Sequence, residues 1–407
     1  MTTTRLPLGV YVLGFTIFSL GTSEFMLAGL LPPMAADLGV SIPQAGALIT
    51  AFAIGMLAGA PVMTLLTLNL PRRTTLLGAA AVFAAMHLLG AVVDDFGLLL
   101  ATRVVSAVAC ATYWAVAAVT AMAISPPRAT ARAMAVVVGG LTVANVVGVP
   151  LGTWIGERGG WQLSFLAVGL ASLLALATTA LLVPETRPRA AARQDYRAVL
   201  RAELTSFRRP QLWVALGTTA TFQAAVFGTF SYLSPMLTDI AHLDPATVPA
   251  ALLLFGFGTL AGVTIGGRYA DRNLLGNVLI SLLALAAALA GLALALRVGG
   301  WVSLAAVALF GAAAFSIASA LNARVLLHAG GAPTLAAAVN VSAFNVGNAL
   351  GPWAGGAVIA GGLGYLAPIW VSLALVAVAL VLAALSWRLE RAPLTQPAPA
   401  VACEAAS

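Results

Sequence analysis

Two ionisable side chains, Glu24 and Arg103, are embedded in long apolar segments of this sequence. Between Arg5 and Asp37 the chain carries no other ionisable side chain except the phenol of Tyr11. An acidic residue at the centre of a membrane helix costs about 2.5–3.5 kcal/mol, so such residues are retained for a function. A carboxylate in this setting can bind and release a proton, and a neighbouring guanidinium offsets the cost of its charge. The pair therefore predicts a proton-binding site.

Glu24 and Arg103 are predicted to lie at one depth. Glu24 precedes Leu31, near the predicted outer end of the first apolar segment, by seven residues, and Arg103 follows Phe96, at the outer start of the fourth, by seven. Seven helical residues rise about 10 Å, so the two side chains share a depth. Two alternatives stay open. In the first, the first segment is shorter and Glu24 reaches the outer membrane interface. In the second, Arg103 is only a structural anchor.

The composition places the chain in a membrane. Of its 407 residues 61% are hydrophobic and 8% are charged, against about 25% charged in soluble proteins. All basic residues are arginine, so a Walker A loop and a lysine Schiff base are excluded. The histidines and the two cysteines predict neither a metal site nor a catalytic triad. We expect no enzyme, and we interpret His87 as a packed or interface histidine.

Apolar runs predict twelve transmembrane helices, each long enough to cross about 30 Å of hydrocarbon. The predicted fold class is an all-α polytopic membrane protein with two six-helix pseudo-symmetric bundles. The predicted spans are 8–31, 43–68, 74–93, 97–124, 133–155, 162–183, 211–235, 248–267, 274–296, 301–323, 335–358 and 366–387.

The arginines indicate the topology. With the N-terminus inside, only Arg158 and Arg297 of the twenty basic residues fall outside and Arg103 falls within a span, which leaves seventeen inside. This asymmetry predicts that both termini are cytoplasmic and makes nucleic acid a poor explanation of the positive charge. We expect an N-terminal bundle at 1–183, a cytoplasmic linker at 184–210, a C-terminal bundle at 211–388 and a disordered cytoplasmic tail at 389–407.

The two halves resemble each other in their glycine spacing. In membranes, glycines four residues apart let helix backbones approach closely. Span five carries such a series beside Pro150, and span eleven carries one beside Pro352. A parallel repeat of six plus six helices is typical of transporters of the major facilitator type. The two series are Gly148, Gly152 and Gly156, and Gly347, Gly351 and Gly355.

Several motifs stand out in the two halves. The N-terminal half carries GTSEFMLAGLLP, AFAIGMLAGAPV, LLLATRVVSA, GVPLG and GERGGW, and the C-terminal half carries GRYADR and GNALGPWAGG. In these stretches the chain resembles the major facilitator superfamily, specifically its twelve-span drug/proton antiporters and, among these, bacterial chloramphenicol exporters. The resemblance implies that Glu24 and Arg103 serve proton coupling and drug binding. It also implies conformational motifs at Arg72, Arg73, Gly148, Pro150, Gly152, Asp271, Arg272, Gly351 and Pro352.

The sequence departs from the family pattern in the loop after span two. The stretch TLLTLNLPRR keeps Arg72 and Arg73 but lacks the family's aspartate, near whose place Leu68 stands. The second copy retains Asp271 and Arg272. An inner latch built on the first aspartate is therefore in doubt.

Aromatic and amide side chains recur at helical spacing and could contact a drug. A neutral aromatic amide suits a mostly apolar pocket with few orienting polar groups, although such side chains also pack or bond between helices. The candidates are Trp114, Gln223, Phe227, Phe230, Asn340, Phe344 and Asn348. Asn145 fits helix packing better.

We expect a secondary active exporter that exchanges protons for chloramphenicol or a related hydrophobic drug. Its expected partners are the drug, protons and the lipid bilayer of the bacterial cytoplasmic membrane, and we expect a monomer. It needs no cofactor, since the proton gradient supplies the energy. The alternatives are an exporter of sugars or other small metabolites and a non-transporting membrane sensor.

Overall fold

The computed structural model describes residues 6–67, 70–126, 129–186, 210–270, 272–328 and 333–391. Within these residues the secondary structure is helical, with no strand. Ten of the described helical segments are long and apolar enough to cross a membrane. The other two predicted spans correspond to α10 (Pro210–Phe230) and α16 (Pro333–Val358). The predicted all-α polytopic fold is confirmed.

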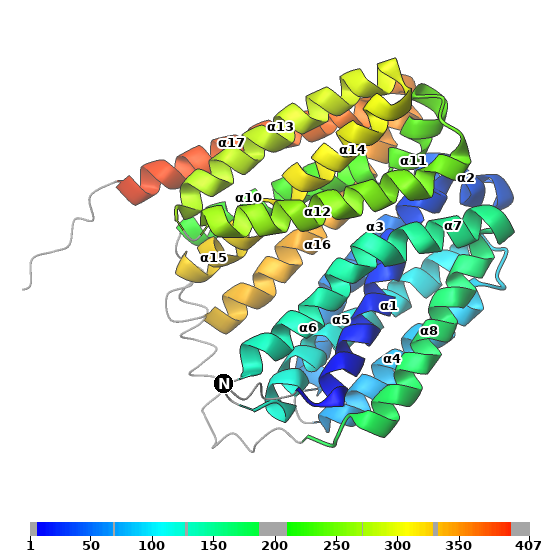
Figure 1. Ribbon diagram of the computed structural model, residues 1–407, viewed down its shortest axis with the longest axis vertical. Helices are drawn as coiled ribbons and strands as arrows, with labels where there is room; N and C mark the ends of the chain where they lie inside the picture. Colours follow the sequence, from blue (N-terminus) through cyan, green and yellow to red (C-terminus); the bar gives the residue numbers. More distant parts are fainter. Residues whose placement is uncertain are drawn as a thin grey trace, which may run out of the picture.

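The helices before residue 187 form one bundle (Figure 1). Their boundaries follow the apolar runs, and short polar or glycine-containing segments separate them. They are α1 (Leu8–Phe25), α2 (Leu27–Asp37), α3 (Ile42–Thr67), α4 (Arg72–Gly90), α5 (Phe96–Ile124), α6 (Thr130–Val143), the π-helix η2 (Ala144–Gly148), α7 (Val149–Gly159) and α8 (Trp161–Leu182).

The helices after residue 209 form the second bundle (Figure 1). Besides α10 and α16 they are α11 (Leu233–Pro235), η3 (Met236–Ile240), η4 (Pro245–Thr247), α12 (Val248–Ala270), α13 (Leu274–Val298), α14 (Gly300–Phe315), α15 (Ala318–His328), η5 (Ile359–Leu363) and α17 (Ala367–Arg391). Most of the predicted linker and tail, together with Leu68 and Asp271, lies outside the described residues. The domain boundaries therefore stay a prediction.

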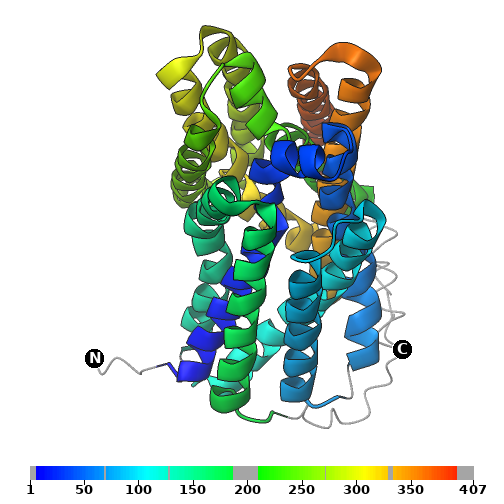
Figure 2. The same cartoon turned by 90° about the vertical axis from the view of Figure 1, so that its right-hand side faces the viewer.

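The first span is interrupted, so the expectation of one helix over 8–31 is wrong. Helix α1 ends at Phe25, and α2 begins at Leu27 and continues to Asp37. Figure 2 shows the change of direction between them. In a continuous helix the Ser23 carbonyl would accept a hydrogen bond from the Leu27 N–H. In this protein it accepts one from Arg103 Nη2 at 3.2 Å. The side chain of Arg103, from another helix, thus donates to the Ser23 carbonyl in place of a backbone N–H of the same helix.

Both glycine series pack against the first helix of their own bundle. A Cβ at Gly148 would meet Thr22 of α1, and one at Gly152 would come within 3.3 Å of Met26. A Cβ at Gly351 would meet the backbone of Ala224 and Gly228 in α10. Small residues therefore give the two bundles the same close contact between the fifth span and the first.

The two bundles touch at the end that carries α2, α7 and α11, opposite the end at which α1 begins and α17 finishes, which we call the termini end (Figure 1). The rings of Phe25 and Phe227 lie 5.4 Å apart across the contact. Thr50 Oγ1 donates to the Ala349 carbonyl at 3.4 Å, and a Cβ at Gly256 would meet the backbone of Asn145 at 2.7 Å. We call this the closed end. Toward the termini the ribbons of the two bundles diverge (Figure 1).

Candidate functional site

The Arg103 guanidinium is held on the face of α1 that carries Ser23. Arg103 is fully buried. Its Nη1 donates to Ser23 Oγ at 2.8 Å, and its Nη2 donates to the Ser23 carbonyl at 3.2 Å. The two bonds join α5 to α1 where α1 is about to end. The helix interruption therefore serves as a docking point for a buried positive charge.

An aromatic ring from α3 completes this setting. The guanidinium carbon of Arg103 lies 4.3 Å from the centroid of the Phe52 ring. A cation over an aromatic face is stabilised by about 2 kcal/mol or more when it is desolvated. Arg103 Nε is buried and has no hydrogen-bond partner among the described residues. A guanidinium carries five donor hydrogens. In this site its charge is held by two hydrogen bonds to Ser23 and by the Phe52 ring.

His87 of α4 forms the next link. Its ring stacks on Phe83 and Phe165, with centroids 4.1 and 5.7 Å away. His87 Nδ1 lies 2.8 Å from the Phe83 carbonyl and Nε2 lies 2.5 Å from Ser23 Oγ. A carbonyl only accepts, so Nδ1 carries the hydrogen, and in the neutral ring Nε2 is then the acceptor. Ser23 accepts from Arg103 and donates to His87.

Glu24 follows Ser23 in the chain but is directed into a different environment. It is partly exposed, whereas Ser23 is fully buried. Its charge lies within Coulombic range of Arg103 and of the Cys110 thiol, both on α5. No described group donates a hydrogen bond to its carboxylate. Arg103 is therefore near enough to stabilise a negative charge on Glu24 but is bonded to Ser23.

The amide candidates bond to one another between helices. Gln223 Nε2 of α10 donates to Asn348 Oδ1 of α16 at 2.8 Å. Asn340 Nδ2 donates to Asn322 Oδ1 of α15 at 2.9 Å. Asn340 Oδ1 is buried without a partner among the described residues. These contacts match the packing interpretation of the amides, and their role in drug binding stays a prediction.

The aromatic candidates fall into two groups. Phe227 and Phe230 are buried and join a chain of rings that runs from Phe25 of the first bundle to Phe255 of α12. Trp114 and Phe344 are partly buried and pack against the apolar core. The buried rings lie at the contact between the bundles, so they can influence how the bundles separate.

The motif residues have structural contacts of several kinds. Arg73 Nη2 donates to the Ala180 carbonyl of α8, and the Arg72 N–H donates to the Thr186 carbonyl at 3.2 Å. Pro150 is buried in the first turn of α7, directly after η2. The Arg272 N–H donates to the Tyr269 carbonyl at 3.1 Å. The Pro352 carbonyl accepts from Tyr232 Oη at 2.8 Å.

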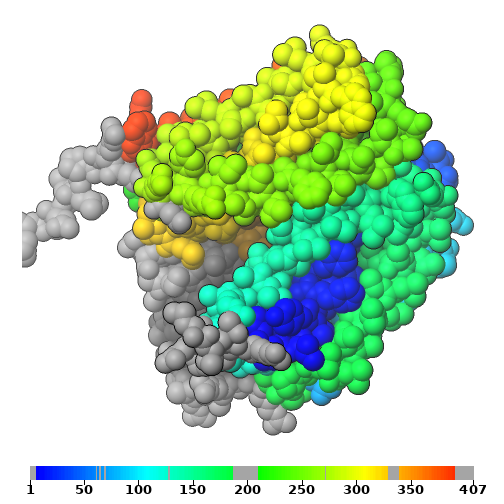
Figure 3. All heavy atoms as spheres, in the orientation of Figure 1, coloured from blue at the N-terminus to red at the C-terminus, as the bar shows by residue number. Residues whose placement is uncertain are grey.

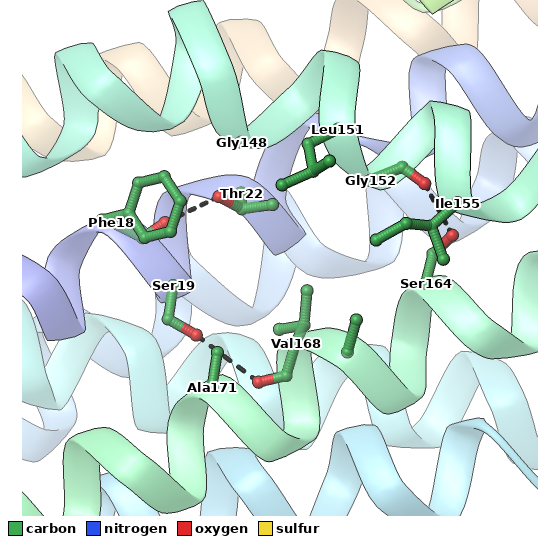
Figure 4. Close-up of a pocket in the computed structure, with 11 residues that line it drawn as sticks. Phe18, Ser19, Thr22, Gly148, Leu151, Gly152, Ile155, Ser164, Val168 and Ala171 are labelled. Atoms are coloured by element: carbon green, nitrogen blue, oxygen red, sulfur yellow. Dashed lines mark hydrogen bonds between the residues drawn. The ribbon is translucent and has the colours of Figure 1, made fainter.

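A separate small groove, with a volume of about 100 Å³, lies between α1, η2, α7 and α8. Figure 3 shows that α1 reaches the molecular surface between α6 and α8. The hydroxyls along the groove are already bonded. Ser164 Oγ donates to the Gly152 carbonyl at 2.7 Å, and Ser19 Oγ donates to the Val168 carbonyl at 3.5 Å (Figure 4). Ser19 Oγ also lies 2.8 Å from Ser172 Oγ. The exposed side chain beside them is Leu151. This apolar groove is distinct from the charged site on the α4 and α5 side of α1.

Sequence reasoning missed Ser23 and Phe52, and it interpreted His87 as a packing residue. The structure does pack His87, and it adds the bond to Ser23. The only sequence signal for Ser23 is its position next to Glu24. Phe52 carries no signal, because its contact with Arg103 joins α3 to α5 across the fold.

The fold and the buried charged site define a polytopic membrane transporter. The chain matches the Major Facilitator Superfamily over residues 13–342. It therefore belongs to that superfamily, whose members are transporters and not enzymes.

Two relatives and one solved structure give the comparison detail. A chloramphenicol resistance protein of Streptomyces lividans is 41% identical over 389 residues, covering 93% of this chain and 96% of the relative. The inner membrane transport protein YdhP of Escherichia coli K12 is 38% identical over 350 residues, covering 86% and 88%. The structure of a bacterial homolog of the human lysosomal transporter Spinster, inward-facing and unoccupied, superposes with a TM-score of 0.75 at 17% identity, covering 95% and 98%.

Proposed function

We propose that this transporter exports chloramphenicol or a related hydrophobic drug in exchange for protons, with Glu24 as the proton site. The observation that carries the proposal is a partly exposed carboxylate at the interruption of a membrane helix, within Coulombic range of a buried arginine. Interrupted helices with ionisable groups mark ion and substrate sites in transporters. The relative named as a chloramphenicol resistance protein supports the choice of drug.

The exchange follows from competition for one cavity. When the cavity opens outward, Glu24 takes up a proton from the more acidic side. When it opens inward, the proton leaves as the drug binds. Exchange of a neutral drug for one proton moves one charge, which is worth about 2.3 kcal/mol per 100 mV.

The proposal includes the orientation of the chain. The arginine asymmetry supports cytoplasmic termini. The closed end, with the Phe25–Phe227 contact, would then face outward, and the structure would correspond to a state open to the cytoplasm. Single cysteines placed in the loops and tested with an impermeant thiol reagent on intact cells report this directly. Labelling of a loop at the termini end would contradict the orientation.

Proton flux in inverted membrane vesicles tests the exchange. A pH-sensitive dye records the gradient, and chloramphenicol is added once the gradient is steady. We expect drug-triggered proton efflux with the wild-type protein and none with Glu24→Gln. Asp94→Asn, which changes an exposed carboxylate outside the site, is the matched control and should behave as wild type.

No response with the wild-type protein present and the gradient intact would refute chloramphenicol as the substrate. The same vesicles then separate the other candidates. A response to sugars would identify a metabolite exporter, and binding of a compound without flux would identify a sensor.

A further inference from the structure

We propose that His87 is a positioning residue that keeps Arg103 bonded to Ser23 and apart from the Glu24 carboxylate. This inference rests on the proposed role of Glu24 as the proton site. His87 bonds to Ser23, which in turn accepts from Arg103, so its effect on the proton site passes through these two residues.

The hydrogen bonds of the three residues run in one direction. Arg103 Nη1 donates to Ser23 Oγ, Ser23 donates to His87 Nε2, and His87 Nδ1 donates to the Phe83 carbonyl. The first donor cannot accept and the last acceptor cannot donate. A hydrogen on Nδ1 is required by the Phe83 carbonyl, and the proposal takes His87 as the neutral ring, so that Ser23 supplies the middle hydrogen.

The behaviour of other hydroxyls in α1 shows why His87 matters. Thr16 Oγ1 donates to the Val12 carbonyl at 3.0 Å, and Thr22 Oγ1 donates to the Phe18 carbonyl at 2.8 Å. Ser and Thr hydroxyls in helices commonly turn back to the carbonyl four residues earlier. Ser23 instead donates to His87. Without that acceptor the Ser23 hydroxyl would turn to its own helix, and Arg103 Nη1 would lose its partner while Nη2 keeps the Ser23 carbonyl.

The freed Nη1 side of the guanidinium would turn to Glu24, because a carboxylate is a stronger acceptor than a hydroxyl. The groups that act on Glu24 are few. Arg103 and Cys110 face it from α5, and His87 faces Arg103 from α4. Helices α3, α8 and α10 carry no acidic, basic, cysteine or tyrosine side chain, and the charges of α6 and α7, Arg132, Glu157 and Arg158, lie toward the helix ends. Besides the burial of Glu24 itself, Arg103 is therefore the group whose position most affects the charge of Glu24.

Two substitutions of His87 separate positioning from packing. His87→Phe keeps an aromatic ring between Phe83 and Phe165 but removes the acceptor for Ser23. His87→Gln removes the ring but keeps an acceptor oxygen. If His87 only packs, His87→Phe should disturb Glu24 less than His87→Gln does. If His87 positions Arg103, His87→Gln should disturb Glu24 less than His87→Phe does.

The test is an infrared pH titration of the carboxyl band of the purified full chain in lipid nanodiscs, with Glu24→Gln identifying the band. An opposite charge that moves next to an acid lowers its titration midpoint by about 1–3 pH units. We expect His87→Phe to shift the Glu24 midpoint by that amount toward lower pH, and His87→Gln to stay near wild type. An unshifted midpoint in folded His87→Phe would overturn the proposal.

A second measurement reads the state of His87 in the wild-type protein. Nitrogen-15 NMR of histidine-labelled wild-type protein should show the signal of one neutral ring with its hydrogen on Nδ1. This signal is assigned to His87 by its absence from the spectrum of His87→Phe. If that variant does not fold, the signal is assigned by exclusion with His242→Gln and His328→Gln. A charged ring or a hydrogen on Nε2 would overturn the proposal. Neither measurement uses a drug, so a protein that fails to export chloramphenicol can still confirm the role of His87.

Discussion

The first helices of the two bundles have the same interruption but opposite chemistry. Helix α1 ends at Phe25 and α10 ends at Phe230, and a short helix begins within three residues of each end, α2 at Leu27 and α11 at Leu233. A hydroxyl pair ties each to the last long helix of its bundle: Ser19 to Ser172 at 2.8 Å, and Thr229 to Ser372 at 2.9 Å. Around the first interruption lie Glu24, Arg103 and His87. Around the second, residues 210–237 carry no charged side chain.

This difference indicates that the two bundles, although similar in fold, have different functions. Since a charge inside a membrane is costly, the repeat keeps charges only where they have a use. The first bundle would bind the proton. The second, with its rings and with Tyr232 bonded to the Pro352 carbonyl, would supply apolar contact and hold the closed end.

The largest expected effect is at Arg103, on the charged side of the comparison. Arg103→Ala removes both bonds to Ser23 and the contact with Phe52. A hydrogen bond to a charged group contributes about 1.5–3 kcal/mol, so we expect a loss of drug transport of roughly 10- to 100-fold. Arg103→Lys should retain more activity, because it keeps the charge. Unimpaired transport by both variants, measured as drug export from loaded cells, would leave Arg103 as an anchor only.

The glycine contacts between the first and fifth spans of each bundle can be compared by adding a methyl group to one glycine in each. An added Cβ at Gly351 meets the backbone of Ala224 and Gly228, which cannot move aside, whereas one at Gly148 meets the Thr22 side chain, which can rotate. Overpacking costs about 1–3 kcal/mol. We expect Gly351→Ala to lower the thermal stability of the purified protein more than Gly148→Ala does. Circular dichroism during heating measures the difference, and the reverse order would show that the two contacts are not organised as described.

A smaller effect is expected at Tyr232, on the uncharged side. Its Oη bonds to the Pro352 carbonyl, and a Cβ at Gly46 of the first bundle would lie 2.5 Å from it. Tyr232→Phe removes one hydrogen bond, worth about 0.5–1.5 kcal/mol. This bond lies within the second bundle and fixes the Tyr232 ring against Gly46 of the first, so without it the closed end should open more often. A cysteine at the neighbouring buried position of α3, Ala45→Cys, should then react faster with a thiol reagent in a Tyr232→Phe background. An unchanged rate would remove Tyr232 from the closure.

The sequence predicts most of the fold and the charged pair, since both follow from local patterns. Apolar runs give the helices, and the isolation of Glu24 and Arg103 among apolar residues singles them out. The interruption at Met26 could not be predicted, because it accompanies a bond from Arg103 in another helix to the Ser23 carbonyl. For the same reason nothing linked His87 to Ser23. The amides were equally ambiguous, since the pairing of Gln223 with Asn348 depends on how α10 meets α16.

The most direct test of the account is to separate proton coupling from drug movement in Glu24→Gln. Purified protein in liposomes is measured in two ways: uptake of labelled chloramphenicol driven by an imposed pH gradient, and exchange of labelled for unlabelled drug with no gradient. The account predicts that Glu24→Gln loses gradient-driven uptake and keeps drug exchange, while wild type and Asp94→Asn show both. Gradient-driven uptake that persists in Glu24→Gln would contradict the account.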